Sequence, residues 1–266
     1  MIKNNPYKPS PAKIISINKE TDVDYTFRLE LSSLGVAYGQ FFQLSIPRIG
    51  EAPISVSDLG EGWIDFTIRG VGKLTNVIHE MKVGETIFYR GPYGNGFAPS
   101  LFRDKELIIT AGGTGTAPVR SIINSILNGH EHVKSLSLLL GFKNTESILF
   151  KNDLDKWEAA FNTHITLDSP CHGWGGKTGF VTDFVNELSI NDNENCCVII
   201  VGPPMMIKYT ALSYLKRDIP KKNIIVSMER LMSCGLGKCG HCKIDYKYIC
   251  VDGPVFNFEE ASNLID

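Results

Sequence analysis

Four cysteines near the C-terminal end are the residues best suited to chemistry in this sequence. Cys234, Cys239, Cys242 and Cys250 follow the spacing C-x4-C-x2-C-x7-C. A cluster of two irons bridged by sulfide takes four thiolates, and the first three cysteines match the plant-type spacing C-x4-C-x2-C. The glycines among them suit a chain that curls around such a cluster, because glycine accepts positive φ and lets amide N–H groups turn toward the sulfurs. These cysteines are therefore the predicted ligands of a 2Fe-2S cluster.

Structural zinc is the alternative occupant of a four-cysteine site. Zinc ribbons usually pair two C-x2-C knuckles across a longer spacer, whereas this segment contains one such knuckle, so the spacing favours the iron-sulfur cluster. Cys171, Cys196 and Cys197 show no ligand spacing and are expected to be small buried hydrophobic residues. His241 could shape the surroundings of the cluster rather than bind it.

A glycine-rich turn between an apolar strand and a helix predicts a site for a pyrophosphate. Free N–H groups and the helix dipole can hold phosphate there. The turn departs from the G-x-G-x-x-G fingerprint, because Pro118 stands where the third glycine would be, and it lacks an acidic residue about 20 positions on. The candidate residues are Gly112, Gly113, Thr114, Gly115, Thr116 and Pro118.

A second rigid turn follows the fourth strand of the same α/β pattern. Ligands bind at the carboxyl ends of parallel strands, where both turns are expected to lie, so together they predict a nucleotide-binding crevice. The second turn comprises Gly202, Pro203, Pro204 and Met205.

Two neighbouring segments of the N-terminal third could hold a flavin. Ser55 could hydrogen-bond a flavin ring nitrogen, and residues 72–75 open a helix that could receive phosphate. Arg69 and Lys73 supply positive charge. Taken alone, these residues are equally typical of an ordinary hairpin and a capped surface helix. The full candidate set is Pro53, Ile54, Ser55, Val56, Ile68, Arg69, Gly72, Lys73, Leu74 and Thr75.

The elements that must position these residues fall into two patterns. Short β-like segments separated by Gly, Pro and Asp predict an antiparallel barrel or sandwich in the first part of the chain. From residue 105 onward, strands alternate with helices, which predicts a parallel sheet covered by helices. Strands are expected at 12–17, 26–31, 41–46, 54–58, 63–68 and 86–89, then at 106–110, 136–141, 164–167, 197–201 and 224–227. Helices are expected at 74–81, 119–127, 153–161, 181–188 and 205–215.

The segment after the last predicted strand is rich in Cys and Gly and cannot continue this alternation. It is expected to form a third unit that is too small for its own core. The predicted domains are therefore a flavin-binding domain at 1–102, a nicotinamide-binding domain at 103–228 and a cluster-binding segment at 229–266.

Composition is that of an ordinary globular protein. Hydrophobic residues make up 43% of the 266 residues, charged residues make up 21%, and the net charge is −2. No basic cluster suggests nucleic acid, and the apolar runs are too short to cross a membrane. The first residues lack the apolar stretch of a secretion signal, so a cytoplasmic location with reduced thiols is expected.

In this order the segments resemble the ferredoxin-NADP reductase superfamily over nearly the whole chain. The cysteine segment narrows the resemblance to the branch with the electron-transfer subunits of dihydroorotate dehydrogenase and the gamma subunits of sulfhydrogenases. The strongest resemblance is to the B subunits of anaerobic sulfite reductases. It rests on GEAPISVSD from Gly50, VGPPMMI from Val201, GKCGHC from Gly237 and CVDGPVFN from Cys250.

The resemblance implies an antiparallel flavin-binding barrel, a five-stranded parallel-sheet nicotinamide domain and a small C-terminal iron-sulfur segment. It also implies that electrons pass from NADH through FAD and a 2Fe-2S cluster to a siroheme-containing catalytic subunit that reduces sulfite to sulfide. A ferredoxin-like subunit is a further expected partner. Because the cofactors carry the redox chemistry, no side chain is nominated as a catalytic acid or base.

Other functions fit the same residues. The chain could serve dihydroorotate dehydrogenase or a hydrogenase, or it could be a zinc-stabilised nucleotide-binding sensor without turnover. The superfamily's flavin motif, Arg-x-Tyr-Ser, corresponds here to residues 52–55, which lack the arginine and the tyrosine. Arg69 or Lys73 is hypothesised to supply the missing phosphate contact. Asp168, at the end of a predicted strand, would repel a 2'-phosphate and favours NADH over NADPH.

Overall fold

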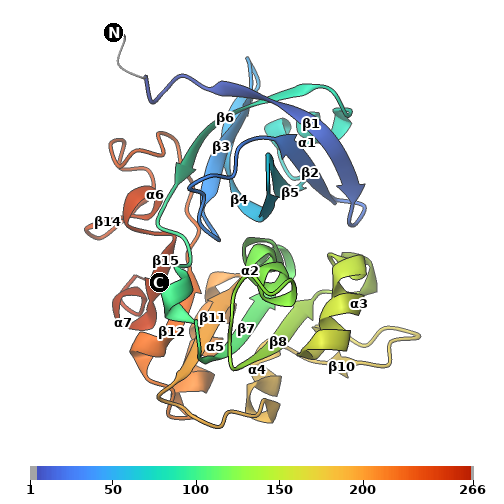
Figure 1. Ribbon diagram of the computed structural model, residues 1–266, viewed down its shortest axis with the longest axis vertical. Helices are drawn as coiled ribbons and strands as arrows, with labels where there is room; N and C mark the ends of the chain where they lie inside the picture. Colours follow the sequence, from blue (N-terminus) through green and yellow to red (C-terminus); the bar gives the residue numbers. More distant parts are fainter. Residues whose placement is uncertain (1–4, 265–266) are drawn as a thin grey trace.

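The computed structural model describes residues 5–264. A β-barrel packs against one end of a helix-covered sheet, and the C-terminal segment lies along one side of both (Figure 1). The ends of the predicted outer domains, residues 1–4 and 265–266, lie outside the described residues. Within the described part, no helix combines the length and the apolar character needed to cross a bilayer.

The first domain is a closed antiparallel barrel with the strand order β1-β2-β5-β4-β3-β6. Because the sheet closes, every strand pairs with two neighbours. Of the two predicted architectures, the domain is therefore the barrel and not the sandwich. Phe27, Phe42 and Phe66 fill its core, and helix α1 covers it with Leu74 and Ile78. The elements are β1 (Ser10–Lys19), β2 (Asp24–Glu30), β3 (Phe41–Ile46), β4 (Gly50–Gly60), β5 (Trp63–Arg69), α1 (Lys73–Glu80) and β6 (Thr86–Tyr93).

The second domain contains a sheet with the order β10-β9-β8-β7-β11-β12-β15. All five predicted parallel strands are present, as β7 (Glu106–Gly112), β8 (Ser135–Phe142), β9 (Asn162–Leu167), β11 (Cys196–Val201) and β12 (Ile224–Ser227). Successive residues of β11 point to opposite faces and all are buried, as expected where helices cover both faces of a sheet. A short parallel strand, β10 (Lys177–Thr178), extends one edge.

The helices of this domain lie where the periodicity predicts them, with small shifts at their ends. The α2 and α5 helices begin earlier than predicted, because Pro118 and Pro204 suit the first helical turn. The helix predicted at 181–188 is a single α-helical turn followed by a 3-10 turn. The helices are α2 (Ala117–Leu127), α3 (Lys151–Ala160), α4 (Val181–Phe184) and α5 (Pro204–Leu215), and the 3-10 turns are Pro99–Leu101, Gly113–Thr116, Thr145–Ser147, Val185–Glu187 and Lys221–Asn223.

The C-terminal segment is built into the second domain rather than standing apart. A strand that the sequence pattern did not predict, β15 (Val255–Asn257), pairs antiparallel with β12 at the sheet edge. Phe256 and Phe258 join the same apolar core as β12 and α5. The segment therefore obtains its core from the nicotinamide domain. Its other elements are β13 (Lys243–Ile244), β14 (Lys247–Tyr248), α6 (Ile249–Asp252) and α7 (Phe258–Ala261).

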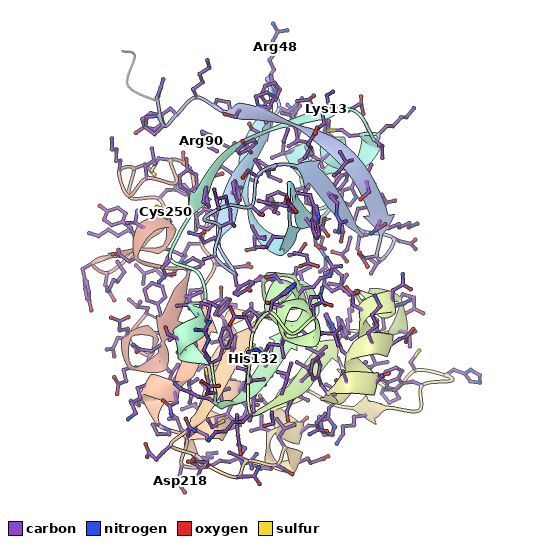
Figure 2. The ribbon with its side chains drawn as sticks, viewed as in Figure 1. Lys13, Arg48, Arg90, His132, Asp218 and Cys250 are labelled. Carbon is purple, nitrogen blue, oxygen red and sulfur yellow. The ribbon has the colours of Figure 1, made fainter. Side chains whose placement is uncertain are left out.

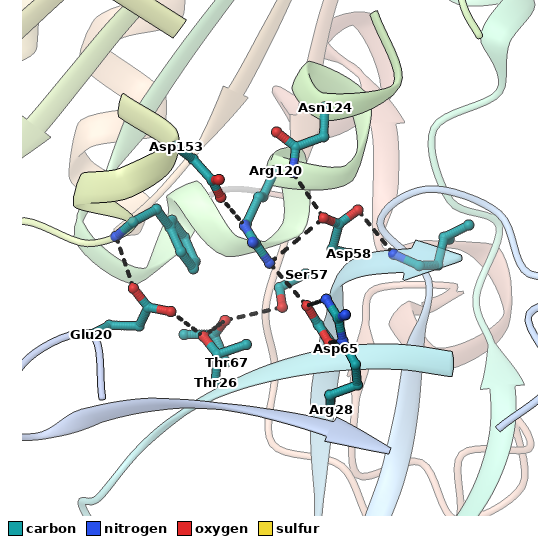
Figure 3. A network of polar contacts seen from close by, with 12 residues as sticks. Glu20, Thr26, Arg28, Ser57, Asp58, Asp65, Thr67, Arg120, Asn124 and Asp153 are labelled. Carbon is teal, nitrogen blue, oxygen red and sulfur yellow. Dashed lines mark hydrogen bonds and ion pairs between the residues drawn. The ribbon is translucent and has the colours of Figure 1, made fainter. Parts of the chain in front are cut away.

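A buried network of charges joins the barrel to the second domain (Figure 3). Arg120 on α2 donates through Nε to Asp153 on α3 at 2.7 Å. Its Nη1 donates to Asp65 of the barrel at 3.2 Å and lies 3.7 Å from Asp58. Asp65 also accepts two bonds from Arg28, at 2.7 and 2.9 Å. One guanidinium therefore holds three carboxylates from two domains.

Two further hydrogen bonds cross this interface, and burial there shifts the pKa of two carboxyl groups. Asn124 on α2 donates to Asp58, and the main-chain N–H of Phe150 donates to Glu20 of the barrel. Burial raises the pKa of both Asp58 and Glu20, and the charge of Arg120 opposes that rise. Ion pairs and hydrogen bonds from neutral donors therefore both link the two domains.

Candidate cofactor sites

A cavity of about 820 Å³ opens at the carboxyl ends of the parallel strands. Its walls come from the loops that follow β7, β8, β9, β11 and β12, with Arg69 of the barrel on the facing side. Strand order reverses between β7 and β11, because β8 and β9 lie on one side of β7 and β11 lies on the other. Such a switch point is where open α/β sheets bind their ligands, and the volume suits a nucleotide.

Close packing explains the glycine turn at the centre of this cavity. A Cβ on Gly115 would lie 2.5 Å from the main-chain oxygen of Val201, so only glycine lets this turn approach the end of β11. The structure brings both predicted turns to the cavity, because Gly112, Gly113, Thr114, Gly115, Gly202, Pro203, Pro204 and Met205 all line it. Thr116 and Pro118 are buried behind the wall.

The cavity also has walls that sequence reasoning missed. The end of β8 contributes residues 141–143, which include Lys143, and the end of β12 contributes Met228, Glu229 and Arg230. These residues directly follow predicted strands of the parallel sheet, and that position could have indicated that they line the ligand site. Asp168, which the sequence singled out, lies in the same wall, and its N–H donates to the Phe142 oxygen at 2.9 Å.

The fold does not bring all the candidate flavin-binding residues to the large cavity. Of these residues, all of which are described, Arg69 alone lines the large cavity. The side chains of Val56, Ile68 and Leu74 pack in the barrel core, which leaves only their main-chain atoms for a ligand. The Thr75 hydroxyl accepts the N–H of Gly72 at the start of α1. The remaining candidates, Pro53, Ile54, Ser55 and Lys73, are at least partly accessible.

Arg69 is not a free cation. Its Nε and Nη2 donate to Asp24 at 2.8 and 3.0 Å, and the Asp24 carboxylate is fully buried. The proposed phosphate contact would therefore use the part of the guanidinium that faces the cavity.

Replacement of Arg69 tests that contact. We expect Arg69→Ala to weaken FAD binding about tenfold, equivalent to about 1.4 kcal/mol, because a charge facing the ligand is lost. Titration of the flavin-free protein with FAD, followed by fluorescence, measures the change. Lys13→Ala, an exposed barrel position away from the cavity, is the control. Unchanged affinity in Arg69→Ala would remove Arg69 from the flavin site.

The four predicted cluster ligands lie in one loop-rich segment beside the barrel. Cys242 and Cys250 are each 2% exposed, whereas Cys239 is exposed and Cys234 is partly exposed. Main-chain N–H groups point at their sulfurs, with Leu236 N donating to Cys234 Sγ at 3.3 Å. Gly237 N likewise donates to Cys250 Sγ at 3.2 Å, from a φ of 67° that glycine accepts readily.

Their surroundings shift the pKa values of the Cys234 and Cys250 thiols in opposite directions. Burial alone would raise the pKa of the Cys234 thiol, but hydrogen bonds from the N–H groups of Leu236, Lys238 and Cys239 lower this pKa to about 6. Burial raises the pKa of Cys250 to about 12. A ready thiolate at the rim, with main-chain donors around it, suits a metal ligand.

The arrangement fits a two-iron cluster. The Cys234 thiol interacts with Cys239, and the Cys250 thiol interacts with both Cys242 and Cys234, so the four cysteines act on one another. Across residues 5–264, no three side chains of His, Cys, Asp or Glu are grouped as they would be around a single metal ion. A two-iron cluster takes four thiolates, which is the number that this segment supplies.

The other cysteines have structural surroundings. Cys196 and Cys197 lie in β11 and are buried, as predicted, and burial raises the pKa of both thiols to about 12. Cys171 is only partly buried, with its sulfur 3.4 Å from the Thr145 hydroxyl.

Comparison with known proteins accounts for the whole arrangement. The oxidoreductase FAD-binding domain matches residues 12–97, and the oxidoreductase NAD-binding domain matches residues 109–211. The iron-sulfur cluster binding domain of dihydroorotate dehydrogenase B matches residues 229–262. The gamma subunit of sulfhydrogenase 1 from Pyrococcus furiosus is 34% identical across 97% of this chain and 94% of its own length. The chain belongs to the ferredoxin-NADP reductase-like family.

Other members of this family show the same extent of similarity. The gamma subunit of sulfhydrogenase 2 from P. furiosus is 36% identical, with 97% of both chains covered. A Methanocaldococcus jannaschii protein, named "Probable dihydroorotate dehydrogenase B (NAD(+)), electron transfer subunit", is 34% identical over 94% of this chain and 90% of its own. A structure of NADH-dependent reduced ferredoxin-NADP oxidoreductase shares the fold, with a TM-score of 0.79, 24% identity, and 96% and 92% of the two chains covered.

The matched domains give the general function. The chain carries the FAD-binding and NAD-binding domains of an oxidoreductase together with an iron-sulfur cluster binding domain. The fold prediction of a barrel, a parallel sheet and an iron-sulfur segment is confirmed.

Proposed function

We propose that this chain takes electrons from NADH and passes them, through FAD and a 2Fe-2S cluster, to a separate catalytic subunit. One observation carries the proposal. Residues 228–230 line the nucleotide cavity and lead directly into the cysteine segment, which begins its ligands at Cys234. Nucleotide cavity and cluster segment are therefore consecutive parts of one folded body.

The residues of the chain bind and orient, while the bound groups supply the chemistry. When bound, FAD would supply acceptance of the two electrons of a hydride, and the cluster would supply one-electron transfer. The turn at Gly112–Gly115 would offer main-chain N–H groups to a pyrophosphate. The turn at Gly202–Met205 lines the same cavity at the start of α5, although Pro203 and Pro204 have no N–H to donate. Cys234, Cys239, Cys242 and Cys250 would hold the cluster, and the N–H groups of Leu236 and Gly237 would donate to its sulfurs.

The choice of NADH over NADPH rests on Asp168. Its carboxylate lies in the cavity wall, where it would repel the extra phosphate of NADPH. We expect Asp168→Asn to raise kcat/KM for NADPH relative to NADH by about tenfold, or about 1.4 kcal/mol. Steady-state rates with both nucleotides give the ratio. Asp155→Asn, an exposed change on α3 away from the cavity, should leave it unchanged. A parent protein that prefers NADPH would contradict the assignment.

Electrons are proposed to leave where the cluster segment meets the surface. Cys239 is exposed there, and Tyr246 and Val251 of the same segment are 75% and 53% exposed. Leu231, just before the first cysteine, is 79% exposed. Large apolar side chains in contact with water often mark a partner surface. We place the catalytic subunit against this segment.

For the acceptor, the relatives favour a hydrogenase or a dihydroorotate dehydrogenase. Sulfhydrogenase gamma subunits match at 34% and 36% identity over nearly their full lengths, and the dihydroorotate dehydrogenase subunit matches at 34%. A siroheme-containing sulfite-reducing subunit, with a ferredoxin-like subunit, is the second candidate. It is favoured by the resemblance of the runs at Gly50, Val201, Gly237 and Cys250 to sulfite reductase B subunits.

Isolation of the native complex separates these acceptors. The chain should be purified anaerobically from its own cells with its partners and assayed for NADH-dependent hydrogen production, orotate reduction and sulfite reduction. A hydrogenase or dihydroorotate dehydrogenase activity supports the first acceptor, and a sulfite-reducing activity with siroheme absorption supports the second. A chain that purifies alone and reduces none of these acceptors would count against a catalytic partner of either kind.

A further inference from the structure

The end of strand β6 places a buried positive charge against the cluster segment. Arg90 is 7% exposed, and its Nε and Nη2 donate to Glu51 at 2.8 and 2.6 Å. Its Nη1 donates to the main-chain oxygen of Cys234 at 3.0 Å and to the Tyr93 hydroxyl at 3.1 Å. A guanidinium of the barrel is therefore bonded directly to a predicted cluster ligand, 144 positions further along the chain.

The same strand end holds the cluster segment at several other points. The ring of Tyr93 packs on Gly235, where a Cβ would lie 2.9 Å from the ring. Asn95 N donates to the Gly253 oxygen at 2.7 Å, and Asn95 Nδ2 donates to the Val255 oxygen at 2.7 Å. Figure 2 shows Arg90 and Cys250 on the same side of the molecule, at this contact. The barrel therefore contacts the segment at its first predicted ligand and again after its last.

Glu51 connects this contact to the flavin side of the barrel. It lies on β4, next to the flavin candidates of residues 53–56, and β4 is joined to β6 through β3. The Glu51 side chain is 27% exposed and that of Arg90 is 5% exposed, so the charge of Arg90 is the more deeply buried of the two. Charges in a shielded environment act strongly on their neighbours.

We propose that Arg90 is a positioning residue that fixes the Cys234 end of the cluster segment on the barrel and raises the reduction potential of the cluster, with Glu51 as its opposing charge. The proposal rests on the proposed function in requiring that the four cysteines hold a cluster. Net charge and hydrogen bonding around a cluster set its potential, and a reduced cluster carries one more negative charge than an oxidised one. A nearby cation therefore favours reduction, and a nearby carboxylate opposes it.

Opposite charge changes test this electrostatic role. The full chain should be purified anaerobically as Arg90→Gln, Glu51→Gln and the double variant, and each cluster titrated with dithionite while the reduced cluster is followed by electron paramagnetic resonance. We expect a lower potential in Arg90→Gln, a higher potential in Glu51→Gln, and a value near the parent in the double variant. Lys222→Gln, which breaks an exposed pair with Glu194, should leave the potential unchanged.

Shifts of the reduction potential in opposite directions would distinguish an electrostatic role of Arg90 and Glu51 from a purely structural one. A purely structural role would shift both single variants in the same direction or in neither, and either result would overturn the proposal. If Arg90→Gln does not fold, Arg90→Lys together with Glu51→Gln carries the test. A potential in Arg90→Lys near the parent, with Glu51→Gln raised, supports the role, and an unshifted Glu51→Gln overturns it. A parent protein without a cluster would overturn both this proposal and the proposed function, whereas a clustered parent with unshifted variants would overturn this proposal alone.

Discussion

Cys250→Ser is expected to abolish the iron-sulfur cluster while leaving NADH and FAD binding in place. Cys250 is 2% exposed, packs in the core shared with β12, and accepts the N–H of Gly237. A serine hydroxyl binds the iron of such a cluster much more weakly than the thiolate it replaces. Iron and acid-labile sulfide should fall to background, and electron delivery to a one-electron protein acceptor should fall with them. NADH oxidation with a dye that takes electrons from flavin should persist.

A matched substitution distinguishes ligand loss from general damage. Cys171→Ser changes a partly buried cysteine that contacts Thr145 and lies outside the cysteine segment. It should retain full iron content and full electron delivery. Retention of the cluster in Cys250→Ser, or its loss in Cys171→Ser, would contradict the assignment of ligands.

Arg120→Gln is expected to be the most destabilising single substitution at the domain interface. The change leaves Asp153, Asp65 and Asp58 without their shared cation, in a region where the Arg120 side chain is only 10% exposed. Breaking a buried ion pair from one side costs about 3–5 kcal/mol in the free energy of unfolding. Denaturant unfolding of the purified protein measures this loss.

The control for Arg120 is a cation in an exposed pair. Lys222, 63% exposed, lies 3.9 Å from Glu194, 76% exposed, and Lys222→Gln should cost less than about 1 kcal/mol. Equal losses in the two variants would show that the interface network adds nothing to stability.

Acid should narrow the difference in stability between Arg120→Gln and the parent. Burial raises the pKa of Asp58 and Glu20 in the folded protein, and Arg120 opposes the rise, so the variant raises both further. A carboxyl with a folded pKa above its unfolded value destabilises the folded state at neutral pH. That penalty disappears as the pH falls through the folded pKa toward the unfolded pKa of about 4. Unfolding free energies at pH 7 and pH 5 test this, and a gap that widens at pH 5 would contradict it.

The sequence carries enough local information to predict most of the fold. The strands and helices of both domains lie close to their expected positions, because alternating polarity and glycine or proline boundaries are properties of neighbouring residues. Strand β15 was missed because its three residues carry no pattern of their own and are ordered by pairing with β12. Tertiary pairing, rather than propensity, determines that strand.

The candidate sites also combine features that are visible in neighbouring residues with features that only the folded chain shows. The cysteine spacing and the two turns of the nucleotide cavity are visible locally, and the fold brings the members of each set together. The contacts of Arg90 with Cys234, Arg120 with Asp65 and Arg69 with Asp24 join residues 144, 55 and 45 positions apart. Nothing in a single sequence relates such pairs, so their roles emerge only from the folded chain.

An anaerobic visible spectrum of the purified protein, recorded before and after addition of NADH, tests whether electrons pass from NADH through the flavin to the cluster. Flavin bands should appear together with a broad iron-sulfur absorption, and NADH should bleach both. A colourless protein that contains zinc would contradict this electron path, because zinc at the cysteines could carry no electrons away from the flavin.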